Sequence, residues 1–496
     1  MKLLWIYSSY ENLGVETLTA ELRRQGHAVD LVLDPRLFDD HFTSVPPLAP
    51  LFSFRKRVLR EAARRAPDAV LFSVVSDDFP WFRDMARAIK EQQQTLVIAG
   101  GIHITSAPVE SLEESVADYG IVGEGDEALP DLLARIEKGA PVEDMPNLVW
   151  RDSAGVVRAN PVRPPVADLD TLPFPDKTIF AHTSYDPRDA YTITCSRGCP
   201  FRCTFCNNDL VKEIYGGAHL RLRSVDNAMQ ELEQAAAQYS PRMINFLDET
   251  FGYDKKWLAE FSAQYAQRIG LPCIACTNPN IVTREYAGLL AAMQCRKVDM
   301  GVQTVNQDLK RRILNRRETP EQTRAAIAHL QSAGICVAAE NIINLPGETE
   351  AHLEEMARFY NATRPDILKV FWLRYYPGTK ILDMGREAGA LNHTDAQDIL
   401  RGRASGSLAS GGSKPSRTAR RFHAFFIFMR FMPPGAVEWI LNHRLYRLFS
   451  VGPLTTVSYA LLRLVGRSRG YEAEIMLYRH KKHVRHYLRK WAAGKL

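Results

Sequence analysis

The 496-residue chain contains 46% hydrophobic and 24% charged residues and has a formal net charge of +6 at pH 7. It is too long for one ordinary hydrophobic core, so we expect a globular protein of about two to four domains. Its first residues hold one lysine and an apolar run too short for a signal peptide, and no stretch offers about eighteen clean apolar residues for a spanning helix. We therefore expect a cytoplasmic location, where clustered cysteines favour metal or redox chemistry over disulfides.

Residues 1–140 alternate short β-rich segments with amphipathic helical patterns. The expected strands at residues 2–7, 28–33, 69–74, 95–100 and 119–122 predict an α/β domain with an open, parallel, doubly wound (Rossmann-like) sheet. Such sheets bind ligands beyond the carboxyl ends of their strands. The loops there need glycines and helix caps even without a ligand, but four polar or glycine-rich loops at one edge favour a pocket. Its candidate residues are Ser9, Asn12, Gly14, Ser73, Ser76, Gly100, Gly101, His103, Gly123, Glu124 and Gly125.

Residues 141–185 are rich in proline and are expected to form an extended linker. Strand–helix alternation then resumes over residues 186–390. Its β-rich segments are residues 190–194, 243–247, 273–277, 297–302, 336–343 and 367–376. Six such units predict a partial (β/α)6 barrel, whose functional loops follow the carboxyl ends of the strands.

Four of the eight cysteines fall in the segment CSRGCPFRCTFC, at Cys195, Cys199, Cys203 and Cys206. A zinc site, two disulfides or a cluster mount could each use them. Structural zinc usually joins two separated ligand pairs, and no second pair with suitable spacing exists here. Three thiolates from one loop suit a four-iron cluster with one iron left open. Cys195 ends the preceding strand, so we expect only Cys199, Cys203 and Cys206 to bind the metal.

This segment resembles the CxxxCxxC loop of radical S-adenosylmethionine (SAM) enzymes, in the form typical of the subgroup with an amino-terminal cobalamin-binding domain. The resemblance implies a [4Fe–4S] cluster whose open iron is chelated by SAM, and cleavage of SAM to methionine and a 5′-deoxyadenosyl radical. It also implies a cellular one-electron reductant. Phe205, before the last cysteine, matches a family position near the adenine of SAM.

Other barrel segments extend the resemblance. In INFLDETF, Asp248 and Glu249 occupy the position where the family presents polar groups to the SAM amine. In a similar way Gln303 is the candidate for the ribose and Arg316 for the SAM carboxylate. Glu340 precedes NLPGET, which is similar to the family's PGET turn with Asn344 in place of glycine. We treat Glu249 and Glu340 as candidate catalytic residues; the alternative is that these polar residues belong to structural networks in the barrel.

Residues 3–135 resemble the cobalamin-binding domain of the same subgroup. Many cobalamin proteins supply an axial histidine from a D-x-H-x-x-G loop after the first strand, but here that loop reads SSYENLG. His41 lies in a D-x-H-like segment after the wrong strand, and His103 matches a position that lines the pocket without binding cobalt. The resemblance therefore implies cobalamin without a histidine ligand. The alternative is a related fold that has lost its cofactor.

Residues 391–496 differ in charge from the rest, with 19 Lys and Arg against 5 Asp and Glu. Their cations alternate with large apolar residues in helical patterns. Such helices can bind a membrane surface or a lipid-like substrate, but we favour a helical cap on the barrel with a solvated basic face. No nucleic-acid motif is present, and no nucleic-acid partner is expected.

Together these features predict a cobalamin-dependent radical SAM enzyme that methylates an unactivated carbon of a small-molecule or lipid-like substrate. A cobalamin-assisted oxidative cyclisation or rearrangement could use the same domains. A protein that binds cobalamin or metal without catalysis is the alternative from another class.

Overall fold

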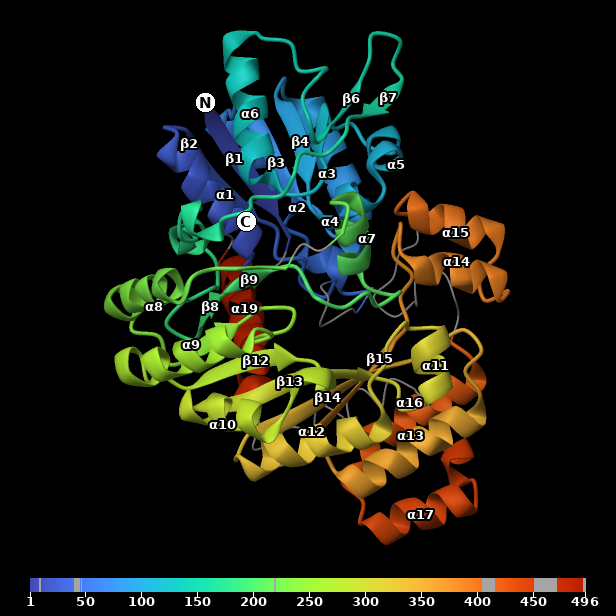
Figure 1. The fold of residues 1–496 in the computed structure, drawn as a ribbon. Helices are drawn as coiled ribbons and strands as arrows, with labels where there is room; N and C mark the ends of the chain where they lie inside the picture. Colours follow the sequence, from blue (N-terminus) through green and yellow to red (C-terminus); the bar gives the residue numbers. More distant parts are fainter. Residues whose placement is uncertain are drawn as a thin grey trace.

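The computed structural model describes residues 1–8, 10–39, 45, 47–217, 220–403, 415–449 and 471–493. An amino-terminal α/β domain lies above a curved barrel sheet, with carboxy-terminal helices beside the barrel (Figure 1). Ser9 and His41, named above, lie outside the described residues.

The amino-terminal sheet has the strand order β2-β1-β3-β4-β5-β6-β7, and its first five strands are parallel. The order reverses between β1 and β3, which is the switch point where doubly wound sheets bind ligands. The predicted strands are confirmed. Their bounds are β1 (Lys2–Tyr7), β2 (Ala28–Leu33), β3 (Ala69–Ser73), β4 (Leu96–Gly100) and β5 (Tyr119–Ile121).

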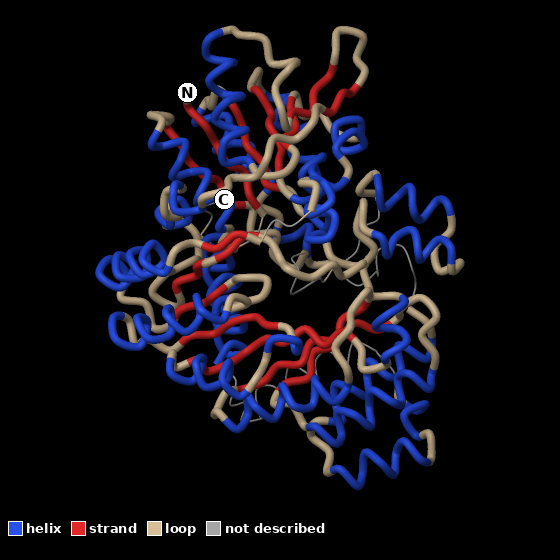
Figure 2. The backbone as a smooth tube through the Cα atoms, viewed as in Figure 1, coloured by secondary structure: helices blue, strands red, loops and turns tan. Residues whose placement is uncertain are grey.

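Helices cover both faces of this sheet (Figure 2). One face packs against α1 (Leu13–Arg24) and α6 (Gly125–Lys138), and the other packs against α2 (Arg55–Arg65) and α3 (Phe79–Gln92). Two short helices, α4 (Ile102–Ser106) and α5 (Pro108–Glu113), follow β4. Alternating side chains of each strand enter the two cores, as expected for a strand buried on both faces.

Part of the expected linker belongs to the sheet. The strands β6 (Leu148–Arg151) and β7 (Val157–Ala159) form a hairpin that adds two antiparallel strands beside β5. Val149 and Val157 are buried in a small core with Leu112 of α5. The linker expected over residues 141–185 therefore begins only after β7.

The second sheet has the order β15-β14-β13-β12-β11-β8, with every neighbouring pair parallel, so the partial six-stranded barrel is confirmed. Its strands are β8 (Tyr191–Ile193), β11 (Ile244–Phe246), β12 (Cys273–Thr277), β13 (Cys295–Gln303), β14 (Cys336–Ile343) and β15 (Ile367–Trp372). The intervening helices are α7 (Asn207–Ile214), α8 (Val225–Tyr239), α9 (Lys255–Arg268), α10 (Arg284–Ala292), α11 (Gln307–Arg312), α12 (Pro320–Ser332) and α13 (Glu350–Thr363). A short ladder joins β9 (Ser196–Arg197) to β10 (Arg221–Leu222).

The carboxy-terminal region is helical, as predicted. After α14 (Lys380–Glu387) and α15 (His393–Leu400), α16 (Arg417–Met429) and α17 (Pro434–Asn442) pack against α13. Phe422, Phe425 and Met429 of α16 are buried in the barrel core. The last helix, α19 (Tyr471–Ala492), packs Tyr487 against Phe54 and Leu37 of the amino-terminal domain. The apolar side of α16 is thus covered by protein, which supports the cap over the membrane-surface alternative for this helix.

Candidate functional site

A cavity of about 400 Å³ lies between the carboxyl edge of the amino-terminal sheet and the first loop of the barrel. We call its two sides the sheet wall and the barrel wall. The apolar part of the sheet wall includes Trp5, Leu13, Leu18, Leu71, Phe72, Ile98, Ile121 and Leu129. The barrel wall consists of Thr194, Ser196, Arg197, Gly198, Asn208, Leu247 and Glu249.

The structure places most of the predicted pocket residues in this cavity. They come from four loops that follow different strands, which is why the sequence separates them widely. The lining includes Gly14, Ser73, Gly100, Gly101, Gly123, Glu124 and Gly125. Asn12 lies just before them and caps α1, where its Oδ1 accepts a hydrogen bond of 2.9 Å from the Val15 N–H.

Two of these glycines also meet a need of the backbone. Gly101 has φ +96, and a Cβ there would lie 2.6 Å from the Val74 nitrogen. Gly123 has φ +78, and a Cβ there would lie 2.3 Å from the hydroxyl oxygen of Tyr215. Glycine at these positions is explained by packing, so the glycines themselves are not a signature of a ligand.

Ser76 and His103 do not lie in the cavity. The His103 side chain has no exposed surface, its Nδ1 is 3.0 Å from Ser76 Oγ, and its ring lies 4.2 Å from that of Phe79. A Cβ on Gly402 would lie 3.0 Å from His103 Nε2, so this distant residue covers the ring. Burial lowers the pKa of His103 to about 4. His103 therefore does not line this cavity, and no histidine occurs among the described residues that do. Its place in a cobalamin pocket stays a prediction.

The sheet wall suits a large, partly apolar cofactor such as cobalamin. Ligand sites of this kind are mostly apolar, with a few polar groups for orientation. Trp5 Nε1 is buried and has no hydrogen-bond partner among the described residues. A buried donor without a partner is costly, and a bound group with an acceptor would satisfy it. The residues present therefore fit the cofactor.

The cysteine loop begins at the end of β8 and runs into α7, whose N-cap is Cys206. The three predicted ligands have few other partners: Cys199 Sγ is 3.8 Å from Thr250 Oγ1, and Cys206 Sγ is 3.7 Å from Asn208 Nδ2. Cys203 Sγ is 3.7 Å from Arg316 Nη1. All three thiols are free, and burial raises their pKa values. Three free sulfurs on one loop fit a cluster, which would hold them as thiolates.

Asp248 and Glu249 are neighbours with different surroundings. Asp248 is buried, and its two carboxylate oxygens accept from the Cys195 N–H at 3.0 and 3.1 Å and from the Ser196 hydroxyl. Burial raises the pKa of Asp248 to about 6. In the structure Asp248 thus stabilises the start of the cysteine loop, and its contact with SAM stays a prediction.

Glu249 instead projects into the cavity, with an exposed side chain on the barrel wall. The surrounding protein raises the pKa of its carboxyl by desolvation, against a hydrogen bond from Asn208. Asn208 also reaches Cys206 Sγ, so it connects Glu249 to the cysteine loop. Glu249 is thus the carboxylate that a ligand near the cluster could reach.

Arg316 and Gln303 lie together near Cys203. Arg316 is 7% exposed; its Nε donates to Glu318 Oε1 at 2.6 Å and its Nη2 donates to the Gly301 carbonyl at 2.6 Å. Gln303 ends β13 with φ +70, beside Gly301. Phe205 is half-buried and packs on the apolar cluster around Leu309. None of the three lines the cavity described here, and their contacts with SAM remain predictions.

Glu340 belongs to a charged group on the inner face of the barrel sheet. Lys369 Nζ lies 3.2 Å from Glu340 Oε1 and 2.5 Å from Asp299 Oδ1, and Lys297 Nζ lies 2.8 Å from Asp299 Oδ2. Burial raises the pKa of Glu340, and Lys369 opposes that shift. This is the structural network named as the alternative for Glu340; its catalytic role remains a prediction.

Sequence reasoning missed the residues that join the two walls. Arg197 donates two hydrogen bonds, of 2.7 and 3.0 Å, to Asp126 at the start of α6. The Tyr215 hydroxyl accepts from the Glu124 N–H at 2.7 Å. Arg197 lies inside the cysteine motif, and that position could have marked it as a residue of the site. No sequence pattern marks Tyr215 in this way.

Comparison with known proteins agrees with this geometry. The model of the B12 binding domain matches residues 4–133, and the model of the radical SAM superfamily matches residues 193–360. An uncharacterized methyltransferase of Pyrococcus horikoshii is 27% identical over 293 residues, which are 58% of this chain and 62% of the relative. The anaerobic magnesium-protoporphyrin IX monomethyl ester cyclase of Rubrivivax gelatinosus is 28% identical over 300 residues, 57% of this chain and 51% of the relative. The chain thus spans about half to three fifths of the length of these relatives.

Among solved structures, the radical SAM methyltransferase TsrM of Kitasatospora setae, with cobalamin and a [4Fe–4S] cluster bound, superposes with a TM-score of 0.64. It is 19% identical, and the match covers 79% of each chain. This likeness establishes the fold. The two matched domains, in this order, show that the chain belongs to the cobalamin-dependent radical SAM enzymes, whose typical cofactors are a [4Fe–4S] cluster, SAM and cobalamin.

Proposed function

We propose that this enzyme methylates an unactivated carbon, with one SAM molecule as the methyl source and a second as the source of the radical. The observation that carries the proposal is that the two matched domains line one cavity from opposite sides. The loops of the cobalamin-binding domain form one wall, and residues beside the cysteine loop form the other. A substrate between the walls would be within reach of both cofactors.

The cofactors supply the difficult chemistry: the cluster delivers the electron that cleaves SAM, and cobalamin carries the methyl group. The protein supplies binding and orientation. Cys199, Cys203 and Cys206 would hold the cluster. Glu249 would pair with the SAM amine, because its carboxylate lines the barrel wall and is linked through Asn208 to the cysteine loop.

The lower side of cobalamin would lie on the sheet-edge loops without a histidine ligand. The described lining residues include none, and His103 is buried beneath Gly402. Gly14, Ser73 and Gly100 of these loops would hold cobalamin, which would supply the methyl group.

An apolar part is proposed for the substrate. Leu247 on the barrel wall is 52% exposed. Phe371 is 50% exposed and lies two residues after Lys369 on β15. Residues two apart on a strand share a face, so Phe371 lies on the inner face of the barrel with Lys369. Ligand pockets are lined mostly by apolar side chains, and Leu247 lines the cavity. These residues support a small-molecule or lipid-like substrate.

Cyclisation or rearrangement is the second candidate, because two matched relatives are cyclases. The experiment that separates the two uses reconstituted enzyme, a one-electron reductant, and SAM labelled in its methyl group, with fractionated small-molecule extract as the substrate source. Methylation predicts label in a new product, with S-adenosylhomocysteine and 5′-deoxyadenosine formed in roughly equal amounts. A cyclase would give 5′-deoxyadenosine and an unlabelled product, which would end the methylation proposal.

A peripheral membrane contact is proposed only for α19. Lys481, Arg485 and Arg489 are exposed along one stripe of that helix, and they border a groove of about 630 Å³. Such a stripe would attract anionic lipid headgroups. Among the helices of the described ranges, none is long and apolar enough to span a membrane.

A further inference from the structure

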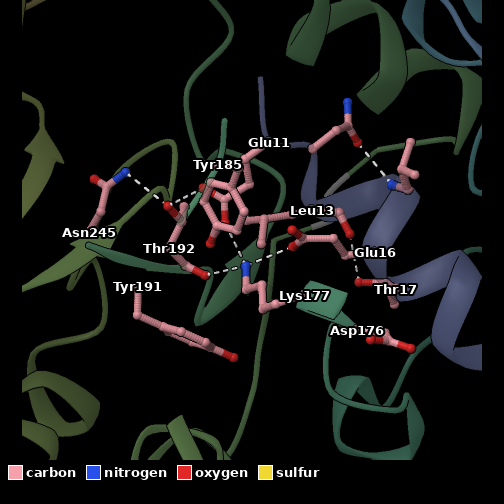
Figure 3. A network of polar contacts seen from close by, with 12 residues as sticks. Glu11, Leu13, Glu16, Thr17, Asp176, Lys177, Tyr185, Tyr191, Thr192 and Asn245 are labelled. Carbon is pink, nitrogen blue, oxygen red and sulfur yellow. Dashed lines mark hydrogen bonds and ion pairs between the residues drawn. The ribbon is translucent and has the colours of Figure 1, made fainter. Parts of the chain in front are cut away.

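A buried lysine, Lys177, connects the segments that carry the two walls of the cavity. Lys177 starts the 3-10 helix Lys177–Phe180, and its side chain is 1% exposed. Its Nζ lies 2.7 Å from Glu11 Oε1, 2.6 Å from Glu16 Oε2 and 2.9 Å from the Thr192 carbonyl oxygen (Figure 3). An ammonium group has three protons, and each has an acceptor here. The acceptors belong to the loop after β1, to α1 and to β8.

Glu11 is the second centre of this group. Its Oε2 accepts from the Thr192 hydroxyl at 2.6 Å, and its Oε1 accepts from the Tyr185 hydroxyl at 2.7 Å. Arg479 Nη1 of α19 lies 3.6 Å from Glu11 Oε2. The Nη2 of the same side chain donates to the Ala190 carbonyl at 2.6 Å. The amino-terminal domain, the linker, the first barrel strand and the last helix therefore meet at one carboxylate.

The charges in this group depend on each other. Burial alone would lower the pKa of Lys177, but attraction by Glu11 and Glu16 outweighs it and raises that pKa. Burial raises the pKa of Glu16 to about 8, while the cations hold the pKa of Glu11 below its usual value. At neutral pH the pair is therefore Glu11 carboxylate with Lys177 ammonium. Buried ions persist only when paired in this way, and the geometry that pairs them is specified closely.

Both anchor points lie next to the cavity. Glu11 precedes Leu13 and Gly14, which line the sheet wall. Thr192 precedes Thr194 and Ser196, which line the barrel wall at the start of the cysteine loop. A shift of Lys177 would thus change the spacing between the walls without touching a residue that lines either one.

We propose that Lys177 is a positioning residue that sets the separation of the two cofactors by fixing the β1 loop against β8. The expected effect of Lys177 on methyl transfer rests on the proposed function. The contact that Lys177 makes between the β1 loop and β8 does not. Methyl transfer between two sites depends steeply on their spacing, and a misplacement of about 1 Å can cost about 100-fold in rate.

The test is Lys177→Met, which keeps an unbranched apolar side chain one heavy atom shorter than lysine and removes its charge. The matched control is Lys90→Met, which removes an ion pair (Lys90 to Asp118, 2.6 Å) within the amino-terminal domain alone. The first readout needs no cofactor: calorimetry of the apo-protein should give one coupled transition for wild type and Lys90→Met, and two separated transitions for Lys177→Met.

The second readout is the distance distribution between the reduced cluster and cob(II)alamin, measured by pulsed electron paramagnetic resonance. It should broaden or shift in Lys177→Met and stay unchanged in Lys90→Met. With SAM as the only added substrate, the ratio of S-adenosylhomocysteine to 5′-deoxyadenosine should fall about 10- to 100-fold in Lys177→Met. An unchanged transition and an unchanged distance distribution in Lys177→Met would overturn the inference.

A milder pair covers the case in which Lys177→Met does not fold. Tyr185→Phe removes a hydroxyl that reaches Glu11 from the linker, and Tyr265→Phe removes one that donates to the Leu271 carbonyl at 2.9 Å inside the barrel. Only Tyr185→Phe should alter the distance distribution; equal distributions in the two variants would contradict the inference. If wild type itself makes no S-adenosylhomocysteine, methylation fails as a function, and the distance distribution still decides the role of Lys177.

Discussion

The two walls of the cavity differ in the way they are built. The sheet wall is formed by strand ends and apolar side chains such as Trp5, Leu71 and Ile121, with glycines where the loops turn. The barrel wall carries Arg197, Asn208 and Glu249 beside three free cysteines. The first wall suits the holding of a large cofactor by its shape, and the second suits charged ligands and metal chemistry. Changes on one wall should therefore leave the function of the other intact.

The largest effect is expected on the barrel wall. Replacing Cys199, Cys203 or Cys206 with alanine should abolish the cluster, because three ligands leave no replacement. Replacing Cys195 with alanine should leave the cluster intact, because the Cys195 thiol is buried. The backbone N–H of residue 195, which donates to Asp248, is kept in the variant. Iron and sulfide analysis after anaerobic reconstitution checks this, with about four of each expected for wild type. Cobalamin binding should survive in all four variants. Cluster loss in Cys195→Ala would show that the ligand set is wrong.

The next effect is expected on the sheet wall. Gly100 lines the cavity at the end of β4, and a Cβ there would lie 3.8 Å from Ile121 Cβ, so valine fits the backbone but fills the cavity. Overpacking of this kind costs about 1–3 kcal/mol. Gly100→Val should therefore weaken cobalamin binding about 5- to 150-fold, measured by titration, while iron content stays normal. Gly288→Val on the surface of α10 is the control. Equal affinities would place cobalamin elsewhere.

A smaller effect separates Glu249 from Asp248. Glu249→Gln should weaken SAM binding by about 1.5–3 kcal/mol, as expected when a hydrogen bond to a charged group is lost. Because the pKa of Glu249 is raised, wild-type affinity should fall as the pH falls through that raised pKa, and Glu249→Gln should show no such fall. Asp248→Ala should instead lower the melting temperature and the retention of the cluster. Equilibrium dialysis across pH 5–8 measures SAM binding, and a Glu249→Gln variant that binds SAM as tightly as wild type would contradict this view.

The smallest effect concerns α19, which lies outside both walls. Wild type should sediment with vesicles containing anionic phosphatidylglycerol and not with neutral phosphatidylcholine vesicles, and binding should weaken as salt rises. Arg485→Glu with Arg489→Glu should reduce it, whereas Arg311→Glu with Arg386→Glu on the barrel side should not. Cofactor binding should be unchanged throughout. Equal sedimentation of the two double variants would remove the membrane contact.

Local patterns predicted the architecture well. The strands follow from short apolar runs, and the cysteine loop follows from spacing within a single segment. The carboxyl-end loops were also placed correctly, because parallel strands bring distant loops to one edge. Asn344, which replaces the family's glycine, has φ +68; asparagine tolerates that left-handed conformation better than other non-glycine residues, so the turn survives the substitution.

Contacts between distant segments were not predictable. His103 is buried because Gly402, about three hundred residues later, packs over it. Asp248 and Glu249 look alike in sequence, and only the fold shows that Asp248 accepts from the Cys195 N–H and the Ser196 hydroxyl, whereas Glu249 lines the cavity. The hairpin β6–β7 was hidden because its short strands precede a proline-rich segment. Lys177 shows the limit most clearly, since its three acceptors come from three separate segments.

The central claim is that the sheet wall serves cobalamin and the barrel wall serves the cluster and SAM. Its most direct test follows methyl-labelled SAM in variants that change one wall at a time. Wild type with SAM and reductant should form both S-adenosylhomocysteine and 5′-deoxyadenosine, with label recovered in the cobalamin fraction. Gly100→Val should lose S-adenosylhomocysteine and keep 5′-deoxyadenosine, whereas Cys203→Ala, loaded with chemically reduced cobalamin, should show the reverse. Loss of both products in each variant, or formation of S-adenosylhomocysteine by Gly100→Val at the wild-type rate, would contradict the account.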